Sequence, residues 1–150
     1  MKKKLKLILI IFAAAFILIQ FIPVNRSNPA SDKTSEIATP PEVITILKTS
    51  CYDCHSNETV WPAYSYIAPM SFFISNDVQE GRKELNFSEW SSYSLKKQQK
   101  KMEEMQEEIA EEKMPMPVYL LMHSDAKLGV DQKMILQKWT STANVAEIKK

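Results

Sequence analysis

The sequence predicts an all-α protein, and three of its features support this fold class. Only two of the 150 residues are glycine, so the chain has little material for the tight turns that join antiparallel strands. No run alternates apolar and polar residues cleanly enough to predict a strand. Apolar residues in the second half of the chain recur instead at the spacing of one helix face.

The N-terminal 22 residues have the pattern of an export signal. Four lysines precede an apolar run over residues 7–22 that contains no acidic residue: Lys2, Lys3, Lys4 and Lys6. Cations beside an apolar stretch stay on the cytoplasmic side, so the following chain is expected to be translocated. The run is about as long as a short transmembrane helix, roughly 17–25 residues, and the small residues 13–15 lie inside it rather than at a cleavage position after it. We therefore predict a retained transmembrane signal anchor over residues 1–22, with a cleaved signal peptide as the alternative.

Residues 23–40 predict a linker, and residues 41–145 the folded domain. The linker is rich in Asn, Ser, Thr and Pro without a periodic apolar pattern, so it is expected to be mobile or loosely laid on the domain. Without the four N-terminal lysines the chain carries 15 basic and 18 acidic residues. No basic face therefore indicates a nucleic-acid partner.

Five helices are expected in the domain. The first, over 41–47, has Pro41 and Glu42 in its first turn, where proline and acidic residues are favoured. The third, over 94–112, has a narrow apolar stripe, and its charged residues indicate a solvated face. The last, over 130–142, is expected to bury Leu136 and Trp139. The other expected ranges are 69–85 and 117–122.

The two cysteines stand three residues apart and a histidine follows at once, in the string Cys51-Tyr52-Asp53-Cys54-His55. This string is typical of c-type haem attachment, in which the cysteines form thioether bonds to the haem vinyl groups and the histidine binds the iron. Three alternatives are weaker. Structural zinc requires four ligands, and there is no second cysteine pair. A thioredoxin-like redox pair requires a βαβ context. A simple disulfide remains the third alternative.

A sixth iron ligand is expected from the segment 113–123. Met114 is the predicted ligand, because the proline that follows it disfavours a helical conformation and holds the residue in an extended loop. Met116, also followed by proline, is the nearest alternative. His123 is expected to cap a short helix or lie at the surface. The predicted site is thus Cys51, Cys54, His55 and Met114, with His55 and Met114 as the metal ligands.

Together these motifs resemble the bacterial haem-binding domain family of small anchored cytochromes. The resemblance covers nearly the whole chain and is carried by residues 51–59 with Trp61-Pro62, Tyr64-Ser65-Tyr66, Ala68-Pro69, Gly81-Arg82, residues 85–90, Met114-Pro115, Tyr119, His123, Ala126, Leu128 and Trp139. It implies a class I-like c-type cytochrome fold around one haem, with His55 and Met114 as axial ligands. The chain departs from the family in having Met116 where members carry a second proline.

The expected function is one-electron transfer by one covalently attached haem c, at the outer, periplasmic face of the cytoplasmic membrane. Met ligation and burial of the ring both favour a raised reduction potential. The protein is expected to be an electron carrier rather than an enzyme. Its partners are expected to be redox proteins, which the sequence does not identify, and the N-terminal helix is expected to attach it to the membrane. The alternative is a haem-based gas or redox sensor, or a peroxidase-like enzyme, with a labile sixth ligand. Trp61, Tyr64 and Tyr66 are candidate pocket residues, and Arg82 a candidate partner for a haem propionate.

Overall fold

The described part of the chain is helical and contains no strand. The computed structural model describes the backbone of residues 2–148 and the side chains of residues 2–142. Its α-helices are α1 (Lys2–Ile19), α2 (Pro41–Ser50), α3 (Tyr52–His55), α4 (Met70–Glu84), α5 (Leu95–Ala110), α6 (Pro117–Leu120) and α7 (Val130–Ile148). Three short 3-10 helices lie between them, η1 (Ala63–Tyr66), η2 (Phe87–Ser92) and η3 (Ser124–Ala126). The predicted all-α class is therefore correct.

The prediction of a membrane-spanning N-terminal helix is wrong. Over the residues that the structure describes, no helix combines the length and the apolarity needed to cross a membrane. The physical reason lies in the bounds of α1, which takes in the four lysines and already ends at Ile19. Its uninterrupted apolar part, residues 7–19, is about 20 Å long at the helical rise per residue, whereas the hydrocarbon core of a bilayer is about 30 Å thick.

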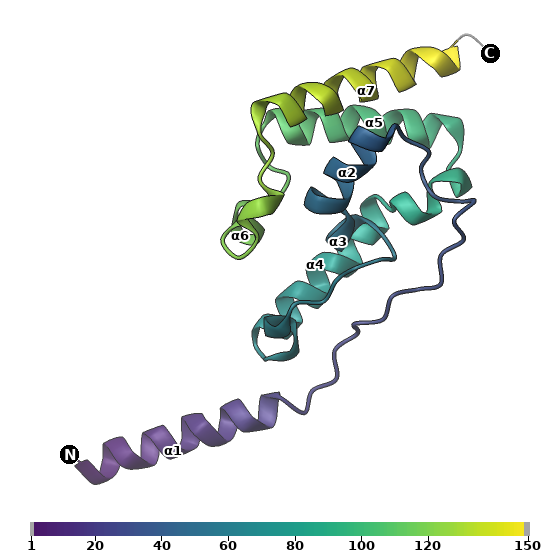
Figure 1. Cartoon of the computed structure of the whole chain (residues 1–150). Helices are drawn as coiled ribbons and strands as arrows, with labels where there is room; N and C mark the ends of the chain where they lie inside the picture. The colour runs from purple at the N-terminus through teal and green to yellow at the C-terminus, as the bar shows by residue number, and fades with distance from the viewer. Residues whose placement is uncertain (1, 149–150) are drawn as a thin grey trace.

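The core forms where α2, η2, α5 and α7 meet. α5 lies along α7, as Figure 1 shows, and α2 packs against α7 and η3. Leu47, Phe87 and Leu136 are the largest apolar side chains that are fully buried. The predicted apolar stripe of α5 is present, since Met102, Met105 and Ile109 are all buried. This core fixes one end of the molecule, and the helices α3 and α4 continue from it.

The segment between α1 and α2 is more firmly attached than predicted. It is extended and runs along the body (Figure 1). Near its end Ile37 is buried and its backbone N–H donates to the carbonyl of Phe87 at 2.9 Å. Ser35 accepts from the N–H of Ser91 at 3.0 Å. Buried apolar contact and paired backbone groups therefore hold the second half of this segment against η2.

Candidate functional site

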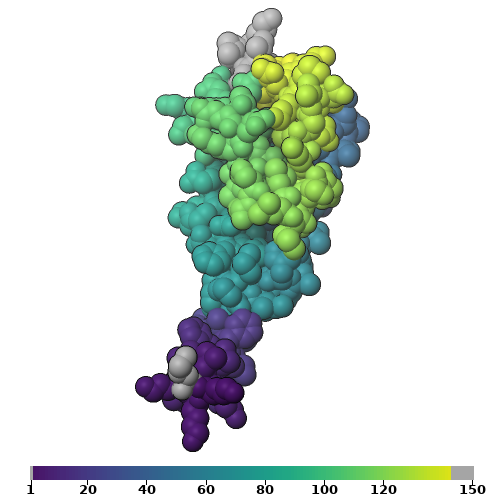
Figure 2. Space-filling model, turned by 90° about the vertical axis from the view of Figure 1, so that its left-hand side faces the viewer, coloured from purple at the N-terminus to yellow at the C-terminus, as the bar shows by residue number. Residues whose placement is uncertain are grey.

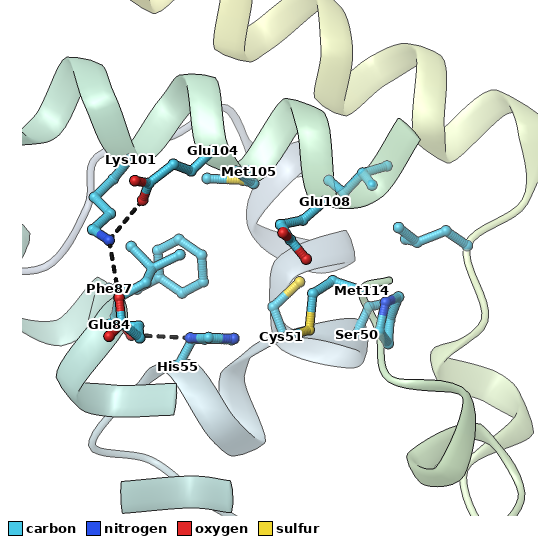
Figure 3. A pocket seen from close by; sticks show the side chains of 14 residues that line it. Ser50, Cys51, His55, Glu84, Phe87, Lys101, Glu104, Met105, Glu108 and Met114 are labelled. Atoms are coloured by element: carbon cyan, nitrogen blue, oxygen red, sulfur yellow. Dashed lines mark hydrogen bonds and ion pairs between the residues drawn. The ribbon is translucent and has the colours of Figure 1, made fainter. Parts of the chain in front are cut away.

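A cavity of about 430 Å³ opens between α5 and the end of α2. It lies within the range of about 300–1,000 Å³ that is common for ligand sites. The predicted site residues Cys51, His55 and Met114 line it (Figure 3). Its apolar wall consists of Leu85, Phe87, Met105, Ile109, Pro115 and Leu128. A second cavity of about 220 Å³ shares the same three site residues and adds Cys54.

His55 is held in one orientation by two backbone carbonyls. Its Nδ1 lies 2.9 Å from the carbonyl oxygen of Gly81 and 3.1 Å from that of Leu85. Because a carbonyl can only accept, Nδ1 carries the proton and the lone pair of Nε2 remains available. Burial lowers the pKa of His55 and so favours the neutral ring. This is the arrangement expected of a metal-ligating histidine, whose second nitrogen is fixed by a hydrogen bond.

The hydrogen bond to Gly81 requires α3 to lie very close to α4. A Cβ built on Gly81 would be 2.7 Å from the carbonyl oxygen of Cys54 and 3.1 Å from its Cβ. Only glycine allows the two backbones to approach this closely. Gly81 therefore sets the distance between the helix that carries the motif and the carbonyls that orient His55.

The two cysteines are half-buried and free. Burial raises the pKa of Cys51 to about 12 and that of Cys54 to about 12. Redox-active and zinc-binding cysteines react or bind as thiolates, which a raised pKa disfavours. Over the described residues, no three His, Cys, Asp or Glu side chains form a group able to hold a metal ion. Neither observation favours the zinc or the thioredoxin-like interpretation.

The two methionines that compete as sixth ligand lie differently. Met114 lines both cavities together with His55, and in Figure 3 the two side chains point toward one another on either side of Cys51. Met116 lines only the smaller of these two cavities. His123 lines neither of them, and its ring contacts Tyr64 and Tyr119. The geometry thus brings together the four predicted site residues.

A family comparison bears on what this site binds. The family described as "Haem-binding domain" matches residues 14–142 of the chain. The chain belongs to the haem-binding domain family. The resemblance stated from the sequence is confirmed, and the protein is a haem protein. No curated protein and no solved structure was found to match the chain.

The residues around the cavity fit the haem of this family. The apolar wall suits the macrocycle, and a histidine with a free Nε2 faces the same space. The hydroxyl of Ser50 is buried without a hydrogen-bond partner. An unpaired buried polar atom costs folding free energy, and a bound ligand with a polar group would remove this cost. Ser50 lines both cavities, and Lys101 lines the larger one beside Glu84 and Glu104. Ser50 and Lys101, the latter paired with Glu84 and Glu104, are therefore polar groups that would face a haem bound in this cavity.

Arg82 does not take the role of propionate partner suggested by the sequence. It is buried, and its guanidinium donates to the carbonyls of Ser56 (2.8 Å) and Ser27 (2.8 Å), to Asn28 Oδ1 (2.7 Å) and to Thr59 Oγ1 (2.8 Å). These bonds fix the loop after the haem motif to the segment before α2. Trp61 and Tyr66 line neither of the two cavities that contain Cys51 and His55, and Tyr64 lines a third cavity beside them.

Replacing Arg82 by Met is expected to lower the free energy of unfolding by about 2–3 kcal/mol, because the buried carbonyl of Ser56 and the buried hydroxyl of Thr59 lose their donor. Urea denaturation of the full chain measures this loss. Lys83→Ala is the matched control, since Lys83 is the exposed neighbour on the same helix. A change within about 0.5 kcal/mol is expected for this control. Equal stability of the two variants would contradict the role assigned to Arg82.

Proposed function

We propose that the protein is a c-type cytochrome that carries one covalently attached haem and transfers single electrons. One observation carries the proposal. His55 is fixed through Nδ1, so that Nε2 is free, and its ring shares a pair of adjoining cavities with Cys51, Cys54 and Met114. A thioether site, a proximal ligand and a distal ligand are thereby available in one place.

Each residue has a distinct role in this proposal. Cys51 and Cys54 would hold the haem through thioether bonds to its vinyl groups, and His55 and Met114 would be the ligands of its iron. The bound haem supplies an iron that cycles between the ferric and ferrous states. Met114 favours a higher reduction potential than a second histidine would. The apolar wall lowers the polarity around the site, which favours a higher potential.

We propose an electron carrier rather than an enzyme, acting outside the cytoplasm. Covalent haem attachment at this motif fits an exported protein, and the lysine-rich N-terminus followed by an apolar run has the order of an export signal. The second candidate is a gas sensor or peroxidase-like protein with a labile sixth ligand. It is favoured by the exposure of the residues after Met114, among which Val118, Leu121 and Met122 are 61%, 80% and 67% exposed.

Spectra with and without carbon monoxide separate the two candidates. The full chain is produced with a c-type maturation system, and reduced and oxidised spectra are recorded. A covalent haem whose reduced spectrum changes only slowly with carbon monoxide supports electron transfer, because a stable Met ligand has to leave before carbon monoxide can bind. A rapid change supports the sensor or peroxidase-like function. Absence of covalent haem contradicts both in their c-type form.

Met114→Ala is expected to abolish the charge-transfer band of a methionine–ferric iron bond, because the thioether sulfur is removed. Met116→Ala is the matched control, since it removes the same side chain two residues along. Absorbance of the ferric protein near the red end of the visible spectrum reports the band. If Met116→Ala abolishes the band and Met114→Ala keeps it, the ligand assignment is wrong.

A further inference from the structure

The segment that carries Met114 has few apolar anchors. We call residues 113–123, which join α5 to η3, the methionine strap. Helix α6 within the strap contributes no buried residue, and Val118, Leu121 and Met122 are largely exposed. The strap lies on the face of the molecule turned toward the viewer in Figure 2. Apolar burial therefore contributes little to holding it, and its polar contacts decide its position.

The first contact joins the strap to the haem motif itself. The hydroxyl of Tyr119 donates to Asp53 Oδ2 at 2.8 Å, and Asp53 lies between the two cysteines. The other oxygen, Oδ1, accepts the backbone N–H of Val60 at 2.9 Å, so the carboxylate is held from both sides. Hydrogen bonds to a charged acceptor are about twice as strong as neutral ones.

A second contact joins the strap to η1. The ring of His123 stacks on that of Tyr119, with centroids 4.2 Å apart and planes at 7°. His123 Nε2 lies 2.5 Å from the hydroxyl of Tyr64 in η1. The backbone N–H of His123 donates to the carbonyl of Tyr119 at 3.1 Å. The two aromatic residues of the strap thus form one stacked unit that is hydrogen-bonded at both sides.

We propose that Asp53, Tyr64, Tyr119 and His123 form a clasp that positions Met114 at the haem cavity. The strap is also tied at its start, where the N–H groups of Lys113 and Met114 approach the carbonyl of Glu108 at 3.0 and 3.2 Å. Without the clasp the strap keeps this tie and its connection to η3 but loses the contacts with Asp53 and Tyr64, so that Met114 leaves the cavity more often. The clasp residues are positioning residues. Their role rests on the proposed function, in which Met114 is the sixth ligand.

The test compares three Tyr→Phe variants of the haem-loaded full chain. Tyr119→Phe and Tyr64→Phe each remove one clasp hydroxyl and keep the ring. Tyr66→Phe is the matched control, because Tyr66 lies in η1 beside the clasp but is 57% exposed. Two quantities are measured: hydrogen–deuterium exchange of residues 114–123 and the rate at which carbon monoxide binds the reduced protein. Each clasp variant is expected to increase both about tenfold, since a charge-assisted or buried hydrogen bond contributes roughly that factor.

The outcomes are decisive in both directions. Faster exchange together with faster carbon monoxide binding, with Tyr66→Phe unchanged, supports the clasp. Unchanged exchange, or faster exchange without faster binding, overturns it. Asp53→Asn is expected to keep more of the wild-type behaviour than Asp53→Ala, because an amide oxygen still accepts from Tyr119. Failure of the proposed function gives a different result, since the wild-type protein then lacks the charge-transfer band or the band survives Met114→Ala.

Discussion

Replacing Cys51 and Cys54 together by alanine is expected to give a protein from which haem is extracted completely by acidified organic solvent. The wild-type protein is expected to keep its haem under the same treatment. The reason is chemical: thioether bonds survive unfolding, whereas axial ligation and apolar contact do not. Mass spectrometry of the unfolded chains measures the difference directly, as the presence or absence of the mass of one haem per polypeptide.

The single variants Cys51→Ala and Cys54→Ala are the controls for this experiment. Each keeps one thioether, so each is expected to retain haem through unfolding and to show a shifted spectrum from the remaining free vinyl group. Haem that stays on the double variant after extraction contradicts attachment through these cysteines. Complete extraction from the wild-type protein means noncovalent binding, and membership of the haem-binding domain family is unaffected.

Gly81→Ala is expected to lower the free energy of unfolding by about 1–3 kcal/mol and to reduce the amount of haem per polypeptide. The added Cβ would meet the carbonyl oxygen of Cys54 at 2.7 Å, and this oxygen belongs to backbone that cannot rotate away. Overpacking of this kind costs about 1–3 kcal/mol. Separation of α3 from α4 also weakens the hydrogen bond from His55 to the Gly81 carbonyl, a further loss of about 1 kcal/mol.

The gain in helix propensity does not offset this loss. Alanine stabilises a helix interior by about 1 kcal/mol relative to glycine, which is less than the sum of the two costs. Gly129→Ala is the matched control, because the nearest atom to its added Cβ is a flexible side-chain oxygen of Gln132 at 3.7 Å. Urea denaturation and haem quantification of both variants provide the test. Equal behaviour of the two would show that the close approach of α3 and α4 is not required.

The sequence predicted the parts of the fold that depend on local pattern. The helix over 94–112 follows from an apolar stripe at helical spacing, and α5 occupies most of this range with Met102, Met105 and Ile109 buried. The haem family follows from residues 51–55 and their companions, and the family match agrees. The length of the N-terminal helix was overestimated, because the end of a helix depends on the chain that follows it as much as on apolar content.

Contacts between segments far apart in the chain could not be predicted from the sequence. Gly81 matched the family pattern, but its role depends on the approach of Cys54 from another helix, which no local signal encodes. Arg82 was a candidate partner for a haem propionate, whereas its partners are backbone carbonyls and side chains of two segments that precede it in the chain. Tyr119 and Asp53 are likewise joined only by the fold. Only the resemblance to the family marked these residues in the sequence, and it did not indicate which contacts they make.

The partners of His55 have a consequence for how the site can change during evolution. Both acceptors of its ring proton are main-chain carbonyls at the end of α4, which every amino acid possesses. No single side-chain exchange can delete them, so the tautomer and tilt of the imidazole are protected against most point substitutions. Adjustment of the histidine's electron donation must come from small displacements of that helix terminus. Variation at residues 81–85 is therefore the route by which related chains would tune the same ring.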